Sequence, residues 1–183
     1  METNRFNRLI KTHHFREQIV ASALARKFKA NLCFNESKEL DKWDYVLYNI
    51  DEAWATSCEQ QQDNVCSSKD GKLCFELYTY NANGTKRLGK LNYTKAKLII
   101  YIIPKLNLLL SLETKRIREL VALHESNGVL ETYTPSNFKK WKQKHDTMPT
   151  ECALLPYDQV VLAAQRSVFT FNELNINPDI FGH

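Results

Sequence analysis

The chain of 183 residues contains few of the residues that interrupt a folded domain. Glycine and proline occur five times each, so we expect no long flexible linker. Long hydrophobic runs are also lacking. The most apolar stretch, residues 98–112, is broken by Pro104, Lys105 and Asn107, which is too short and interrupted for a membrane helix. We therefore expect no membrane partner, and this stretch predicts two buried strands instead.

The cysteines are odd in number, and their spacing does not group them into pairs. The five cysteines, at positions 33, 58, 66, 74 and 152, form no C-x-x-C pair, which argues against a structural zinc site and a disulfide framework. Reduced thiols in a cytoplasm fit this pattern. The first residues are polar and no apolar core follows them, so we expect no secretory signal. A cytoplasmic location follows, in the host cytoplasm if a phage encodes the chain.

Several catalytic signatures are missing as well. The five histidines show no H-x-x-x-H spacing, and the sequence has no phosphate-binding G-x-x-x-x-G-K-[ST] or G-x-G-x-x-G loop. A G-x-S-x-G nucleophile elbow is also absent. Zinc hydrolases, nucleotide-binding enzymes and serine hydrolases therefore have no support. The net charge of +4 and the pI near 8.7 permit nucleic-acid binding without requiring it.

Periodicity predicts a mixed fold. Apolar residues at helical spacing predict helices over 7–29 and 113–124, and a short helix is expected over 157–164. Strand patterns cover residues 43–48, 53–62, 72–80, 97–103 and 106–112, with a short edge strand at 153–156. We predict an α/β (α+β) fold with a central mixed β-sheet flanked by helices. Residues 1–130 would form the core domain, and residues 131–183 a basic C-terminal extension packed on it.

Two carboxylates suggest a metal site in the middle of the chain. Asp44 lies in a predicted strand, and Glu59 and Gln61 lie near the end of the next one. Because residues i and i+2 of a strand share a face, Glu59 and Gln61 should point the same way, towards a paired strand that carries Asp44. Such converging carboxylates suit a hard cation such as Mg²⁺ or Mn²⁺. The alternative is that both are solvated residues on an exposed face.

Basic residues form two groups. Lys86, Arg87, Lys90, Lys95 and Lys97 cluster in the loop that would lie near the active edge of the sheet, while Lys139, Lys140, Lys142 and Lys144 surround Trp141. Lysine and arginine neutralise phosphates, and an aromatic ring can stack on an unpaired base. The sequence thus offers DNA as a partner. A solvated surface is the competing interpretation, with Trp141 as a core anchor for the tail.

The order of these motifs resembles the PD-(D/E)XK nuclease-like superfamily, and within it small phage and bacterial nuclease-like proteins. The resemblance covers residues 7–123. Asp44 stands at the place of the family's first Asp, and Glu59-Gln60-Gln61 at its Glu-x-Lys, with Asp63 shortly after. The sequence continues with a turn at 69–72, Glu76, a glycine loop at 88–91, the segment 94–97 and a hydrophobic strand at 98–101.

The resemblance implies a restriction-endonuclease-like fold and a DNA-cutting, metal-dependent activity. Asp44 and Glu59 would bind the metal, and Glu76 and Glu17 would serve as outer or second-metal carboxylates. Two departures matter: Gln61 replaces the expected catalytic lysine, and Lys97 replaces an expected Asp. Lys95 or Lys72 could supply a charge instead. Enzymes of this superfamily often act as dimers, so the resemblance allows a homodimer.

We therefore favour a divalent-metal-dependent DNA endonuclease, with Asp44, Glu59, Gln61 and Lys95 as its catalytic residues. The alternative is a nuclease-fold protein that has lost catalysis and binds DNA or a host protein without cutting. A third hypothesis is an α+β interaction protein with no nucleic-acid role.

Overall fold

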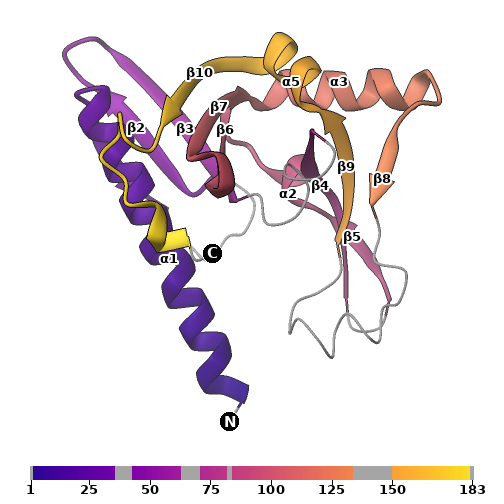
Figure 1. The fold of residues 1–183 in the computed structure, drawn as a ribbon, viewed down its shortest axis with the longest axis horizontal. Coiled ribbons are helices and arrows are strands. Elements are labelled where there is room, and N and C mark those ends of the chain that lie inside the picture. Colours follow the sequence, from indigo (N-terminus) through magenta and orange to yellow (C-terminus); the bar gives the residue numbers. More distant parts are fainter. Residues whose placement is uncertain (1, 36–42, 63–70, 82–83, 134–149, 182–183) are drawn as a thin grey trace. The chain divides into compact units, whose positions relative to one another are not determined.

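The computed structural model describes residues 2–35, 43–62, 71–81, 84–133 and 150–181. They form an α+β protein with a mixed sheet, as predicted (Figure 1). The chain divides into two compact units. The first comprises residues 1–62, 95–111 and 166–183, and the second comprises 63–94 and 112–165. The boundary expected after residue 130 therefore falls inside the second unit, and the last residues of the chain belong to the first.

The first unit carries a six-stranded sheet. Its strands lie in the order β1 (Asn31–Phe34), β2 (Tyr45–Asn49), β3 (Trp54–Gln62), β6 (Leu98–Ile103), β7 (Leu108–Glu113) and β10 (Gln165–Thr170). Neighbours β1, β2 and β3 are antiparallel, whereas β3 and β6 run parallel. The 3₁₀ helices η1 (Pro104–Leu106) and η2 (Pro178–Phe181) complete the unit. The nearly continuous burial of β6 and β7 confirms the two buried strands expected from their apolar sequences.

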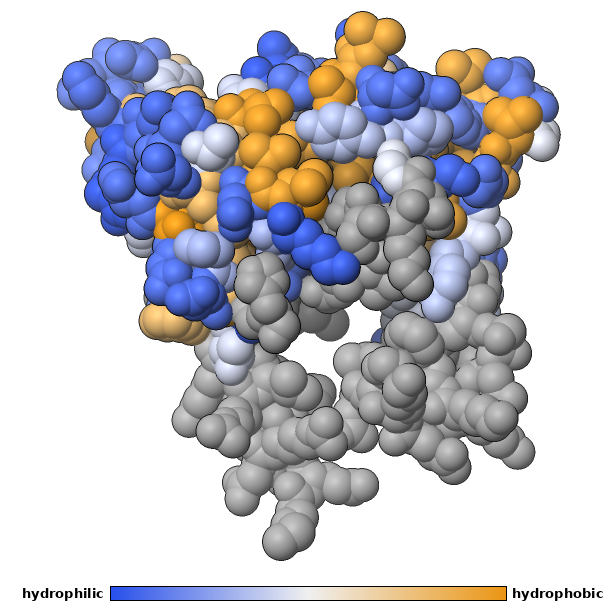
Figure 2. Space-filling model, viewed as in Figure 1, coloured by the Kyte–Doolittle hydropathy of each residue, from blue (hydrophilic) through white to orange (hydrophobic). Residues whose placement is uncertain are grey.

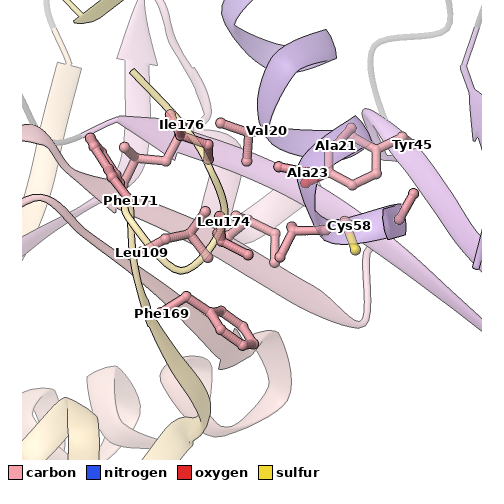
Figure 3. Close-up of a cluster of buried hydrophobic side chains, with 14 of the residues drawn as sticks. Val20, Ala21, Ala23, Tyr45, Cys58, Leu109, Phe169, Phe171, Leu174 and Ile176 are labelled. Carbon is pink, nitrogen blue, oxygen red and sulfur yellow. The ribbon is translucent and has the colours of Figure 1, made fainter. Parts of the chain in front are cut away.

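Helix α1 (Glu2–Lys27) packs on one face of this sheet and forms its core. Its buried residues Val20, Ala21 and Leu24 recur at helical spacing and meet Tyr45 and Cys58 from the strands. Figure 3 shows this cluster, which also takes in side chains from the C-terminal segment. The end of the chain is therefore anchored by its apolar residues, Phe171, Leu174, Ile176 and Phe181.

The end of α1 gives a stability prediction. Lys29 has φ +50°, and the N–H groups of Lys29 and Ala30 donate to the carbonyls of Arg26 and Ala25, which is a Schellman ending. A β-carbon is strained in this left-handed conformation. We expect Lys29→Gly to raise the free energy of unfolding by about 0.5–1 kcal/mol, measured by urea denaturation. Lys29→Ala is the matched control and should give no gain. An equal gain in both variants would mean that the lysine side chain, and not backbone strain, is unfavourable.

The second unit carries an antiparallel sheet of four strands. Their order is β5 (Lys86–Leu88), β4 (Lys72–Tyr80), β9 (Thr150–Pro156) and β8 (Glu131–Tyr133). Two sequence expectations are corrected here. The strand 72–80 does not join the sheet of β2 and β3, because it pairs with β5 and β9. The expected edge strand at 153–156 is internal, because β8 covers its outer side.

The helices described in the second unit are α2 (Lys90–Tyr93), α3 (Thr114–Ser126) and α5 (Tyr157–Ala164). Arg118 of α3 binds the end of α2 by donating to the carbonyls of Leu91 and Thr94. Leu162 of α5 is 90% exposed, and Figure 2 shows apolar side chains at the top of the view, over this helix. Among the described residues, no helix combines the length and apolar character needed to cross a membrane.

Candidate functional site

Asp44 lies immediately before β2. Its side-chain carboxylate accepts a hydrogen bond from a backbone N–H of the neighbouring strand β3. Its own carbonyl accepts from the N–H of Asn35 at 3.0 Å, and its N–H donates to the carbonyl of Cys58 at 2.9 Å. The backbone N–H of Gln60 then donates to Asp44 Oδ2 at 2.6 Å. A charge-assisted bond of this kind is short and strong. One oxygen of the carboxylate is thus fixed at the point where the ladder between β2 and β3 begins.

Glu59 lies beside Asp44 on the neighbouring strand. Tyr45 pairs with Cys58 at the end of the antiparallel ladder, and the bond from the Gln60 N–H to Asp44 Oδ2 brings the Asp44 carboxylate next to the residue that follows Glu59. Glu59 is only 5% exposed, so it is not a solvated residue on an open surface. Asp44 itself lies just outside the paired strand in which the sequence analysis placed it.

Gln61 follows Glu59 on the same face. In the parallel pairing of β3 with β6, Glu59 lies beside Ile99, and Gln61 lies beside Tyr101. The alternate residues of β6, Ile100 and Ile102, belong to the core formed with α1. Glu59 and Gln61 therefore occupy the sheet face opposite α1. Both faces are buried at this point, because Ile99 and Tyr101 are also buried.

Glu17 approaches from α1, on the other face. It is 8% exposed, and its Oε2 lies 3.1 Å from Nδ1 of the exposed His14. The buried Tyr45 lies within the electrostatic influence of Glu17, Asp44 and Glu59. Burial, then Cys58, then these carboxylates raise the pKa of Tyr45 well above its usual range. Negative charge is thus concentrated around the start of β2.

The thiol of Cys58 is affected by the same negative charge. Burial, followed by the charge of Asp44, raises the pKa of Cys58 to about 12. The Tyr45 hydroxyl is buried and has no hydrogen-bond partner among the described residues. A buried hydroxyl of this kind often marks the place of a water or an ion. The thiol of Cys58 stays protonated and takes no part in chemistry at neutral pH.

Two of the described residues, Asp44 and Glu59, offer oxygen atoms of the kind that a hard cation prefers. Carboxylate oxygens are the preferred ligands of Mg²⁺ and Mn²⁺, and Asp44 and Glu59 carry such oxygens. Within the described part of the chain, no group of three or more histidine, cysteine, aspartate or glutamate residues is placed to hold a metal. Glu76, also expected to bind metal, lies on β4 in the sheet of the second unit. Water or phosphate would have to complete the coordination.

Lys95 and Lys97 lie at the start of β6 and are exposed. The N–H of Lys97 donates to Ser57 Oγ at 3.0 Å, which places Lys97 beside Ser57 on β3. Lys95 precedes Ile99, the neighbour of Glu59, by four residues, a span of up to about 13 Å in an extended chain. The structure therefore does not place Lys95 beside Gln61.

The other predicted DNA-binding residues lie elsewhere. Lys86 and Arg87 are exposed on β5, and Lys90 begins α2, all in the second unit. Lys86 is already engaged, because its Nζ lies 3.0 Å from Glu151 and 3.7 Å from the centre of the Tyr78 ring. Lys139, Lys140, Trp141 and Lys142 lie outside the described residues, as do Asp63 and the turn at 69–70.

One residue near the carboxylates escaped the sequence analysis. Arg16 precedes Glu17 on α1, and its guanidinium donates to the Ile180 carbonyl at 2.7 Å and to Gln62 Oε1 at 3.3 Å. It thereby ties the C-terminal segment and the end of β3 to α1. No local sequence signal could have found it, since both partners are distant in sequence.

Comparison of the chain with family models, with curated proteins and with solved structures gives no match.

Proposed function

We propose that this protein is a divalent-metal-dependent DNA endonuclease of restriction-endonuclease-like fold. The observation that carries the proposal is the hydrogen bond from the Gln60 N–H to Asp44 Oδ2 at 2.6 Å, which brings Asp44, immediately before β2, close to the buried Glu59 of β3. The mixed sheet after helix α1, with β1, β2 and β3 antiparallel and β6 parallel to β3, is compatible with such a fold.

Asp44 and Glu59 would hold Mg²⁺ or Mn²⁺ between them. When bound, such an ion supplies Lewis-acid stabilisation of a phosphodiester and lowers the pKa of a coordinated water. The bond from Gln60 N–H to Asp44 Oδ2 fixes the carboxylate in position. The amide of Gln61, on the same face, can donate a hydrogen bond to a phosphate oxygen. Lys95 and Lys97 can neutralise the phosphates of the DNA strand.

A second function is favoured by a different observation. Gln61 stands where the family resemblance expects a lysine, so an ammonium group that could position or activate water is missing there. Moreover, Asp44 has a structural task in the ladder that needs no metal. A protein that binds DNA, or a host protein, without cutting accounts for both facts.

A cleavage assay combined with a binding assay separates these functions. The purified chain is incubated with supercoiled plasmid and with single-stranded circular DNA, in Mg²⁺, in Mn²⁺ and in EDTA. We expect nicked or linear product only with metal. In parallel, fluorescence anisotropy measures the binding of a labelled oligonucleotide at two salt concentrations in EDTA. Salt-sensitive binding without cleavage would support the second function. Neither cleavage nor binding would exclude both.

A further inference from the structure

Two cysteines far apart in sequence meet on the sheet of the second unit. Cys74 of β4 pairs with Leu154 of β9, and Glu76 pairs with Cys152. Because residues two apart on a strand share a face, Cys74 and Cys152 leave the same side of the sheet as diagonal neighbours. Both are free thiols. This pair was not predicted from the sequence, because the chain has no C-x-x-C motif.

The two thiols are in contact. The Cys74 side chain forms a hydrogen bond with Cys152, and the Thr150 hydroxyl lies 3.6 Å from the Cys152 sulfur. Cys152 is 5% exposed, whereas Cys74 is half-buried. A small oxidant can therefore reach the pair from the side of Cys74. The register of β4 and β9 shifts just beyond it, between Glu76 and Tyr78.

These contacts favour a thiolate at Cys152. The hydrogen bond from Cys74 lowers the pKa of Cys152, against the opposing effect of burial, and the Thr150 hydroxyl lowers it further. The carboxylates of Glu76 and Glu151 act in the opposite direction. Thiolates, not thiols, react with peroxides. Cys58 provides a contrast within the same chain, because its raised pKa keeps its thiol protonated.

We propose that Cys74 and Cys152 are a redox-sensitive pair that closes to an intrachain disulfide when a peroxide reaches it. The Cys152 thiolate attacks hydrogen peroxide, an S–O bond forms, the O–O bond breaks and hydroxide leaves. The Cys74 thiol then attacks the resulting sulfenic sulfur. The S–S bond forms, the S–O bond breaks, and water leaves with the Cys74 proton. Two electrons pass from the two thiols to the peroxide.

The geometry makes this bond reversible. Diagonal neighbours in an antiparallel pair have α-carbons roughly 7–8 Å apart, slightly more than the usual span of a disulfide, about 4.4–6.8 Å. The strands must shift locally for the bond to close, so the disulfide would be strained and easily reduced. This property suits a switch better than a permanent structural link, and it agrees with a reducing compartment.

Mass spectrometry tests the proposal on the full chain. The reduced protein is treated with stoichiometric hydrogen peroxide, its free thiols are blocked with N-ethylmaleimide, and it is digested without reduction. We expect a crosslinked peptide joining Cys74 to Cys152, which dithiothreitol removes. In Cys74→Ser, dimedone should label Cys152, whereas in Cys152→Ser the labelling of Cys74 should be several-fold weaker.

Exposed Cys33 serves as the internal control, since it tests exposure alone. Preferential oxidation of Cys33, while Cys74 and Cys152 stay reduced, would overturn the proposal. A bond from either cysteine to Cys66 would also overturn it. If a serine variant fails to fold, Cys74→Ala and Cys152→Ala replace it in the dimedone experiment. The result does not depend on DNA cleavage. The redox proposal can therefore be right or wrong independently of the proposed function.

Discussion

Replacing Asp44 with asparagine should abolish metal-dependent DNA cleavage while leaving the fold intact. The substitution keeps a side-chain oxygen that can accept from the Gln60 N–H, now at 2.6 Å from Oδ2, but removes the charge that would hold the cation. Metal stabilisation of a phosphodiester transition state is worth several kcal/mol, so the rate should fall by about 10²–10⁴-fold. Single-turnover cleavage in Mn²⁺ measures the loss.

Comparison with Asp44→Ala separates chemistry from structure. Alanine removes the acceptor as well and leaves a buried N–H without its partner, which costs about 1–3 kcal/mol. Asp44→Ala should therefore be inactive and less stable, whereas Asp44→Asn should be inactive with nearly the stability of the unchanged protein. Urea denaturation in EDTA gives both stabilities without any contribution from bound metal.

Glu59→Gln on β3 is the counterpart of Asp44→Asn. Besides cleavage, metal binding is measured for both variants. A cation that binds only the folded state raises Tm, so Mn²⁺ should stabilise the unchanged protein and neither the Asp44→Asn nor the Glu59→Gln variant. Cleavage at the normal rate by either variant would contradict the assignment of the carboxylate pair. Loss of cleavage with an unchanged Mn²⁺ effect on Tm would place the metal elsewhere.

Local patterns were sufficient to predict α1, β3 and the buried strands β6 and β7. The helical spacing of Val20 and Leu24 and the apolar sequence of β6 are properties of neighbouring residues, which a sequence displays directly. The short strand β1 was missed, because its four residues NLCF carry too little pattern. β10 was missed because the only apolar residues in its sequence QRSVFT, Val168 and Phe169, are adjacent, so the sequence shows no alternation of apolar and polar residues.

The pairing of distant strands could not be predicted. β4 follows β3 in sequence, yet it pairs with β9, and Phe75 lies opposite Ala153. Nothing in the composition of β4 distinguishes this partner from β3, because strand propensity is the same for either sheet. The expected position of Glu76 in a site with Asp44 depended on that choice. The pairing of β2 with β3, which brings Asp44 near β3, could be predicted because a single hairpin joins these strands.

The largest expected effect on stability comes from Gly89, at the start of α2. A β-carbon built there would lie 2.8 Å from the main-chain atoms of Glu76, Leu77 and Tyr78, closer than real β-carbons approach other atoms. These atoms belong to the strand β4 at its register shift and cannot rotate away as a side chain could. Gly89 has φ −83°, so the requirement for glycine is steric and not conformational.

An alanine at position 89 should separate α2 from β4. The Leu77 carbonyl accepts from Gly89 N–H and from Asn92 Nδ2, both at 2.7 Å. Overpacking costs about 1–3 kcal/mol, and each weakened hydrogen bond about 1 kcal/mol. We therefore expect Gly89→Ala to lower the free energy of unfolding by about 2–4 kcal/mol, measured by urea denaturation, and to increase hydrogen exchange in β4.

Two further variants test the cause of this loss. Asn92→Ala removes one of the hydrogen bonds without a clash and should cost about 1 kcal/mol. Gly84→Ala introduces a β-carbon with no atom within 4 Å, but at φ +82°, so it measures conformational strain alone, about 1 kcal/mol. If Gly89→Ala cost no more than Gly84→Ala, the close approach of Gly89 to β4 would not be a requirement of the fold. A larger cost, together with faster exchange of the β4 amides, would establish that contact as the reason for glycine at this position.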